Sequence, residues 1–219
     1  MIMDEFFERM REQFDELLKD QPLLTDMVES DDFVRITGTY VLHEILNSEL
    51  FSDSFHLDIT VLSDFPRSVP KVKELGKRIS TKNYRDHIYP DRTLCLEVNT
   101  RIIMELDGNP SLYFFNERFI KPYLLGFLYY QKNRRFPFGD YSHGSDGLLE
   151  FYCKLFNVDD KPKAKQLLGL VFDENYKGHR DCPCGSGKRF RNCHSDQVVN
   201  FRESKFKDNY FSDYIFIKG

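Results

Sequence analysis

Alternating apolar and polar residues predict an antiparallel sheet in the first third of the chain. Residues 33–43 and 54–62 place apolar side chains mainly at every second position, which is typical of strands with one buried face. The apolar positions are Val34, Ile36, Tyr40 and Leu42 in the first segment and Phe55, Leu57, Ile59 and Val61 in the second. A third, short strand is expected at about residues 70–75, after the turn that Pro66 and Pro70 bracket.

Segments with helical spacing of apolar residues precede and follow these strands in the sequence. Residues 3–19 carry one apolar stripe, and helices are also expected over 116–132, 146–156 and 161–174. Pro122 is expected either to begin the helix over 116–132 at its first turn or to kink it. A helix, a run of strands, a cysteine-bearing loop and further helices, in this order, predict an α+β fold with an antiparallel meander sheet.

Bulk composition narrows the class of protein without identifying it. The chain has 219 residues, of which 41% are hydrophobic and 30% charged, as in ordinary globular proteins. No apolar run is long enough to span a bilayer, and the acidic N-terminal residues do not resemble a targeting signal, so no membrane association is expected. The formal net charge of −4 gives no reason to expect nucleic-acid binding.

The cysteines indicate a compartment and one candidate site. There are five of them, and three lie in the segment CPCGSGKRFRNCH, which begins at Cys182. Without a secretory signal, an odd number with such a cluster favours a metal site and additional free thiols over a disulfide framework. We therefore expect a reducing, cytoplasmic setting.

This segment offers the ligands of a closed tetrahedral zinc site, namely Cys182, Cys184, Cys193 and His194. Thiolates one residue apart can bind the same ion only if the backbone turns tightly, and the glycines at 185 and 187 allow such a turn. Zinc would then supply the folding free energy of a segment too small for its own core. A phosphate-binding loop fits less well, because GSGKR lacks the earlier glycine and the hydroxyl residue after the lysine.

The same residues resemble the SEC-C motif, a zinc module found at the C-terminus of the bacterial translocation ATPase and attached to many unrelated proteins. Its typical pattern is CPCGSGKKYKxCC/H, and the segment here agrees with it at each metal-ligand position. The resemblance implies zinc binding and says little about the rest of the chain. We expect the zinc knuckle to cover residues 176–198 and an aromatic C-terminal tail to follow over 199–219.

Cys95 is a second candidate, in the stretch HIYPDRTLCLEV at residues 87–98. A cysteine between two leucines is usually a buried packing residue, and the stretch alone does not distinguish this role from a reactive thiol. His87 could donate a hydrogen bond or accept a proton, or it could be a solvated loop residue. Asp91 could orient or deprotonate a reacting group, or it could form the turn. His143 lies in a glycine-rich loop and could either approach Cys95 or fix that loop by hydrogen bonds.

The surroundings of Cys95 look like the core of ubiquitin-conjugating enzymes. That family has a strand, a turn of the form Tyr-Pro-x-x-Pro-Pro-Lys-Val, and later an HPN–Ile-Tyr–x-Asp-Gly–x-x-Cys-Leu run. The matching residues are Pro66, Pro70, Lys71 and Val72 in the turn and Ile88, Tyr89, Asp91, Leu94, Cys95 and Leu96 in the run. The resemblance implies a conjugating domain over residues 1–175, with Cys95 as the thioester cysteine and His87 in the place of the family's asparagine.

The segments FIKPYL, FPFGDYSHGSDGLLEFY and KGHRDCPCGSGKRFRNCH together resemble the bacterial conjugating-enzyme-like proteins of short CBASS anti-phage operons. That resemblance implies a cGAS/DncV-like nucleotidyltransferase as the partner. Its C-terminal glycine would be carried as a thioester on Cys95 and transferred onward, which regulates cyclic-oligonucleotide synthesis. Two other functions stay open from the sequence: a cysteine hydrolase that uses Cys95 with His87 or His143, and a non-catalytic zinc-containing scaffold.

Overall fold

The computed structural model describes residues 2–82, 84–137, 142 and 144–219. The chain folds as two compact units, unit 1 at Met1–Gly139 and unit 2 at Asp140–Gly219. Residue 175, where the sequence placed the end of the conjugating domain, lies inside unit 2. The helices expected at 146–156 and 161–174 therefore belong to the same unit as the cysteine cluster.

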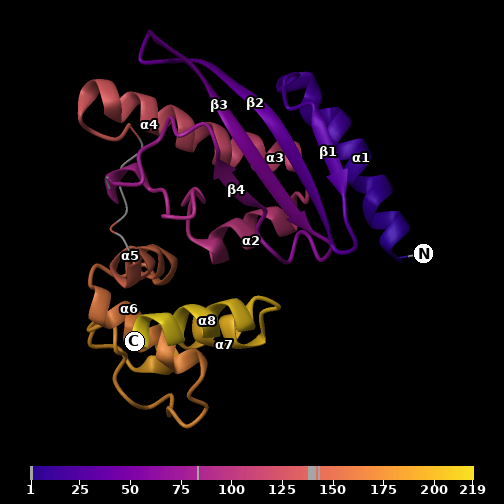
Figure 1. Cartoon of the computed structure of the whole chain (residues 1–219). Helices are drawn as coiled ribbons and strands as arrows, with labels where there is room; N and C mark the ends of the chain where they lie inside the picture. The colour runs from indigo at the N-terminus through magenta and orange to yellow at the C-terminus, as the bar shows by residue number, and fades with distance from the viewer. Residues whose placement is uncertain (1, 83, 138–141, 143) are drawn as a thin grey trace. The chain divides into compact units, whose positions relative to one another are not determined.

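Unit 1 is an antiparallel sheet flanked by helices (Figure 1). Among the described residues, its strands are hydrogen-bonded in the order β1-β2-β3-β4, so each pairs with its neighbour in sequence. This confirms the α+β class and the antiparallel meander. The elements are α1 (Ile2–Asp20), β1 (Asp26–Glu29), β2 (Phe33–Leu46), β3 (Glu49–Leu62), β4 (Lys71–Glu74), η1 (Tyr84–Asp86), α2 (Asn99–Gly108), α3 (Leu112–Phe115), η2 (Asn116–Ile120) and α4 (Lys121–Asn133).

β2 and β3 form a long hairpin that is paired over its whole length. Its two-residue turn, Asn47-Ser48, has φ angles of 52° and 66°, and positive φ at both positions is characteristic of the type I′ turn. The hairpin extends beyond the alternating segments of the sequence. Backbone pairing continues toward the turn through residues such as Ile45 and Leu50, which are directly opposite each other and exposed.

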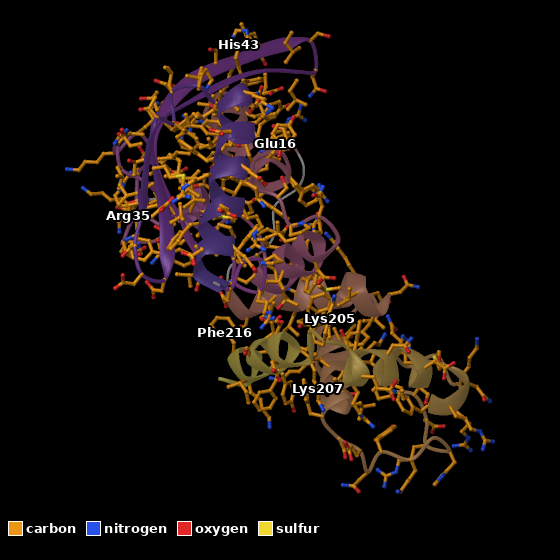
Figure 2. The ribbon with its side chains drawn as sticks, turned by 90° about the vertical axis from the view of Figure 1, so that its right-hand side faces the viewer. Glu16, Arg35, His43, Lys205, Lys207 and Phe216 are labelled. Carbon is orange, nitrogen blue, oxygen red and sulfur yellow. The ribbon has the colours of Figure 1, made fainter. Side chains whose placement is uncertain are left out.

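The inner face of the sheet forms the core of unit 1. All eight apolar positions predicted for the two long strands are buried, and none is more than 2% exposed. Intervening residues, such as Arg35 and His43 (Figure 2), are exposed. Fully burying one such apolar side chain contributes about 1.5–3 kcal/mol, so a one-residue slip of register would be strongly unfavourable.

Helices α1 and α4 contribute to the same core. Phe6, Met10 and Leu17 of α1 are buried, which confirms the apolar stripe predicted over residues 3–19. The helix expected over 116–132 consists of a five-residue π-helical turn, η2, followed by α4, and Pro122 stands in the first turn of α4. Helical structure is continuous across this junction, because the amide of Lys121 donates to the carbonyl of Asn116 in η2, so Pro122 lies next to the π-helical turn and not at a free helix end.

Unit 2 consists of helices together with the cysteine cluster. Its elements are α5 (Gly144–Phe156), α6 (Lys161–Val171), η3 (Phe190–Asn192), α7 (Ser195–Glu203) and α8 (Lys207–Lys218). The tail expected over 199–219 is mostly helical, and Tyr210 and Ile217 of α8 are buried. The hydroxyl of Tyr152 in α5 donates a hydrogen bond of 2.7 Å to Asp213 in α8. None of the described helices combines the length and the hydropathy needed to cross a membrane.

Candidate functional site

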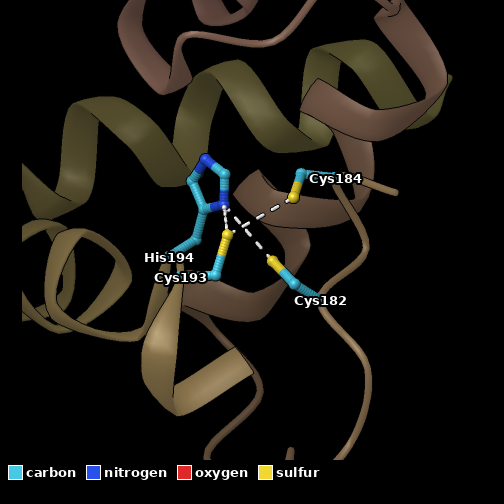
Figure 3. A group of neighbouring side chains, drawn as sticks. All are labelled: Cys182, Cys184, Cys193 and His194. Carbon is cyan, nitrogen blue, oxygen red and sulfur yellow. Dashed lines mark hydrogen bonds between the residues drawn. The ribbon is translucent and has the colours of Figure 1, made fainter. Parts of the chain in front are cut away.

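Four metal-ligating side chains converge in unit 2 (Figure 3). One ligand atom from each of Cys182, Cys184, Cys193 and His194 lies within 4.8 Å of the others. The sulfurs of Cys184 and Cys193 are 3.5 Å apart. Nδ1 of His194 is 3.3 Å from the sulfur of Cys182 and 3.2 Å from that of Cys193. The fold thus brings together all four ligands that the sequence spacing predicted.

These separations suit a tetrahedral ion. With metal–sulfur bonds of about 2.3 Å and metal–nitrogen bonds of about 2.0 Å, two sulfurs lie about 3.8 Å apart and a sulfur and a nitrogen about 3.5 Å. The three distances given above are shorter by a few tenths of an ångström and the other separations do not exceed 4.8 Å, so small side-chain movements would admit the ion. Three thiolates and one imidazole are also a donor set that suits zinc, and the cluster is compatible with zinc binding.

The backbone around the cluster makes a tight turn. Gly185 and Gly187 have φ angles of 78° and 72°, where a side chain would be strained. The amide of Cys182 donates to the carbonyl of Lys188 at 2.9 Å, and the amide of Gly185 donates to the carbonyl of Cys182 at 3.1 Å. This turn allows Cys182 and Cys184 to direct their sulfurs toward one point.

A contact outside the ligand set orients the histidine. Nε2 of His194 lies 3.0 Å from the backbone oxygen of Phe156, the last residue of α5. Because a carbonyl oxygen can only accept a hydrogen bond, this contact assigns the proton to Nε2. Nδ1, which faces the cysteine sulfurs, then keeps the lone pair that a metal ion would bind.

The ligand spacing and this geometry agree with one known motif. Residues 181–196 match the SEC-C motif. The matched range includes all four residues of the cluster. Comparison of the chain with curated proteins and with solved structures found no match. The SEC-C motif accounts for the metal-ligand cluster, and the function of unit 1 has to be inferred from its own geometry.

Cys95 lies in unit 1, on a segment that runs beside β4. The amide of Leu94 donates to the carbonyl of Val72 in β4 at 2.8 Å. The amide of Cys95 donates to the carbonyl of His87 at 2.7 Å. These hydrogen bonds hold the thiol at the edge of the sheet, a few residues before α2.

The thiol of Cys95 is half-buried and lines a pocket of about 290 Å³. The walls come from β4 and the turn before it, from the segment that carries Cys95, and from the first turn of α2. Most of the lining is apolar. The polar or charged residues that line it beside the thiol are Lys71, Tyr89, Thr93, Glu97 and Asn99.

Burial and two neighbours set the ionisation of Cys95. Burial raises the pKa of the thiol, the Tyr89 hydroxyl opposes this by donating to the sulfur at 3.7 Å, and the Glu97 carboxylate raises the pKa further. The net shift is upward, so Cys95 is a protonated thiol at neutral pH. The pKa of Tyr89 is raised to about 12. The main cause is the charge of the Cys95 thiolate, and the second is burial.

His87 contacts the Cys95 segment through its backbone. Its carbonyl accepts the amide of Cys95 and, at 3.2 Å, the hydroxyl of Tyr123. The residue has a φ of 49°, and its ring packs edge-on to Phe136 with 5.7 Å between ring centres. His87 does not line the Cys95 pocket. His143, the other histidine considered for this site, lies outside the described residues.

Asp91 forms the turn before Cys95. Its carboxylate accepts hydrogen bonds from the amide and the hydroxyl of Thr93, at 3.1 and 2.9 Å, and forms ion pairs with Lys71 and Lys73, at 3.1 and 3.4 Å. The hydrogen bonds from Thr93, followed by those from the lysines, hold the pKa of Asp91 well below its usual range. A carboxylate stabilised in this way is a weak base, which agrees better with turn formation than with proton transfer.

Sequence reasoning missed the polar residues that follow Cys95 in this pocket, Glu97 and Asn99. Both belong to the region where α2 begins, and that helix was not predicted. A signal for it was present, because Ile102 and Leu106 are four residues apart and buried on one face. Extending a helix back from this pair would have placed Asn99 in its first turn.

Replacing Tyr89 by Phe is expected to raise the pKa of Cys95 further, because the hydrogen bond that stabilises the thiolate is lost. Alkylation of Cys95 by iodoacetamide should be slower than in the wild type at about pH 8 and should converge with it at higher pH, where both thiols are ionised. Peptide mass spectrometry measures the rate at Cys95 alone. Tyr113→Phe, at a tyrosine that is 38% exposed, is the control. Identical pH profiles for Tyr89→Phe and the wild type would contradict this role.

Proposed function

We propose that unit 1 is a ubiquitin-conjugating-like acyl carrier, in which Cys95 accepts the activated C-terminus of a partner protein as a thioester and transfers it to an amine. The observation that carries the proposal is the pocket at Cys95, where a half-buried thiol lies beside a phenol, a carboxamide and a carboxylate. Covalent acyl transfer needs an accessible nucleophile with polar groups near the reacting carbonyl, and this pocket offers both. The antiparallel meander flanked by helices also supports it.

The proposed reaction has two steps. In the first, Cys95 loses its proton, its sulfur bonds to the carbonyl carbon of an activated acyl group, and the activating group leaves. In the second, an amine bonds to the same carbon, the carbon–sulfur bond breaks, and an amide is formed while the thiol is regenerated. The sequence shows no nucleotide-binding loop with which to activate a carboxylate, so the acyl group is activated before it reaches Cys95, either by another protein or within the partner itself.

The environment of Cys95 favours transfer to an amine over hydrolysis. Cysteine hydrolases use a thiolate whose pKa is lowered by an adjacent histidine. Here burial is the main cause that raises the pKa of Cys95, and the pocket has no histidine among its described lining residues. We therefore favour the carrier over a hydrolase that uses Cys95 with His87.

As the partner we propose a cGAS/DncV-like nucleotidyltransferase that ends in glycine, in the cytoplasm, because the sequence resembles proteins of short CBASS operons. A pocket of about 290 Å³ is at the small end of ligand sites, which suits a terminal residue without a side chain. Transfer of this terminus would regulate antiviral signalling.

For the SEC-C cluster we propose zinc in a structural role. Four protein ligands complete a tetrahedral coordination sphere and leave no open position for water or substrate. The ion would therefore stabilise unit 2 and take no part in the chemistry at Cys95.

Co-expression with such a nucleotidyltransferase and the remaining proteins of its operon, followed by non-reducing gels and intact mass spectrometry, tests the proposed function. The wild type should form an adduct that thiol reductants remove, Cys95→Ser should form an ester that resists them, and Cys95→Ala should form neither. Cys153→Ala, at a free thiol of unit 2, is the matched control and should form the adduct normally. An adduct of equal yield in Cys95→Ala would contradict the proposal, and turnover of a linked substrate without an adduct would favour the hydrolase.

A further inference from the structure

Most side-chain donors in the Cys95 pocket are already engaged. The Tyr89 hydroxyl donates to the thiol sulfur at 3.7 Å. The ammonium of Lys71 and the hydroxyl of Thr93 both contact the carboxylate of Asp91, at 3.1 and 2.9 Å. Apart from the thiol itself, the carboxamide of Asn99 is the remaining side-chain donor among the residues that line the pocket.

Asn99 is available to a bound molecule. It is the first residue of α2, its side chain is exposed, and no described residue forms a hydrogen bond with it. A carboxamide offers two N–H donors and carries no charge. It can therefore bind an oxygen in the pocket without adding a counter-ion for the thiolate.

The first turn of α2 is firmly held, so the backbone that carries this carboxamide is fixed beside the pocket. The amide of Ile102 donates to the carbonyl of Val98 at 3.1 Å, and the side chain of Ile102 is 1% exposed. Arg101 of α2 forms ion pairs with Glu97, which precedes the helix, and with Glu105 within it, at 2.5 and 2.9 Å. A donor on a fixed backbone has less to reorganise when charge develops than a donor on a mobile segment, and therefore stabilises that charge more effectively.

We propose that the Asn99 carboxamide donates a hydrogen bond to the acyl oxygen of a thioester on Cys95, and that this bond strengthens as the oxygen becomes an oxyanion. The inference rests on the proposed function. It assigns the oxyanion donor to a residue four positions after the thiol, and not to His87, whose ring packs against Phe136.

The charge that Asn99 stabilises arises in both steps of the reaction. When a thiolate or an amine bonds to the carbonyl carbon, one electron pair of the carbonyl moves to its oxygen. When the carbonyl re-forms, the bond to the activating group breaks in the first step and the carbon–sulfur bond to Cys95 breaks in the second, where the proton of the amine goes to solvent. Asn99 neither gains nor loses an atom, and only the energy of the tetrahedral intermediate depends on it.

A small acyl donor tests this assignment without a protein partner. The 2-mercaptoethanesulfonate thioester of acetyl-glycyl-glycine should exchange its acyl group onto wild-type Cys95, and Nα-acetyl-lysine should then remove it, both followed by intact mass. Asn99→Ala should slow both steps about 10²–10³-fold, the usual loss when one oxyanion donor is removed. Asn99→Asp has almost the same size but no N–H donor, and should be as slow.

Two controls separate an oxyanion role from a structural one. Iodoacetamide alkylates a thiol at a saturated carbon, where no oxyanion forms, so Asn99→Ala should be alkylated at the wild-type rate. Asn109→Ala, at the opposite end of α2, should exchange and transfer acyl groups like the wild type. If wild type takes up no more acyl group than Cys95→Ala, the proposed function fails. If wild type reacts and Asn99→Ala keeps pace, or if its alkylation falls in parallel, the Asn99 assignment fails.

Discussion

Removal of the metal is expected to unfold residues 176–194 while most of α5 and α6 stays folded. Within that segment, only Cys182 and Phe190 are buried, which is too little apolar area to fold a chain of this length. Structural zinc in small modules contributes about 10–16 kcal/mol of binding free energy at neutral pH, and this becomes folding free energy. By contrast, α5 and α6 have buried apolar side chains of their own, including Phe156 and Leu167.

Metal analysis and hydrogen exchange check this expectation. Protein purified without chelator should contain about one zinc per chain. After chelation, or in Cys182→Ala, the backbone amides at positions 182 and 185 should exchange rapidly, because the turn that protects them is lost. Cys153→Ala removes a thiol outside the cluster and should keep both the metal and the protection. Metal-free protein in which these amides stay protected would overturn the structural role of the ion.

Replacing Arg92 by Ala is expected to destabilise unit 1 by about 3–5 kcal/mol, the cost of leaving a buried charge without its partner. The Glu74 side chain is fully buried, and its carboxylate accepts hydrogen bonds from the Arg92 guanidinium and, at 3.3 Å, from the amide of Ile79. Arg92 also donates to the backbone oxygens of Glu74 and Ile79, at 2.6 and 3.0 Å. It therefore ties β4 to the loop that leads to Cys95. Urea unfolding measures the change.

The matched control is Arg78→Ala. The side chain of Arg78 is 46% exposed and pairs with Asp53 at 2.8 Å, so its loss should cost less than about 1 kcal/mol. The backbone amide of Arg78 donates a hydrogen bond to the Glu74 carboxylate at 3.2 Å, and this hydrogen bond is kept in Arg78→Ala. Equal destabilisation by the two substitutions would show that the buried pair of Glu74 and Arg92 contributes no more to stability than the exposed pair of Arg78 and Asp53.

The long strands and α1 could be predicted because each has one buried face. β1 could not, because none of its four residues is buried and it forms through backbone pairing with β2, which a side-chain pattern does not reveal. α2 is ten residues long with three buried positions, a weak periodic signal. α8 has apolar side chains on several faces, with Tyr210 buried and Phe216 60% exposed (Figure 2), so its sequence indicates an aromatic tail more readily than an amphipathic helix.

The two candidate sites differ in how far they can be predicted from the sequence. The metal ligands lie within one short segment, so spacing alone brings them together. The Cys95 pocket is assembled from the chain before and within β4, the loop after it and the start of α2, and no local pattern shows which polar side chains meet there. The position of His87 depends on a left-handed backbone conformation and on the distant Phe136, neither of which spacing can indicate.

The contact between His194 and α5 would link an ion bound at the cysteine cluster to the end of a helix. The last four carbonyls of a helix accept no hydrogen bond from an amide of the same helix. In α5 the first two of these accept the amides of Val158 and Asn157, at 2.9 and 3.2 Å. The last two accept the side chains of Gln197 and His194, at 2.7 and 3.0 Å, from 42 and 38 positions further along the chain. An ion that fixes His194 therefore also acts as part of a C-terminal helix cap, and losing it should fray the final turn of α5, a helix that contributes no ligand.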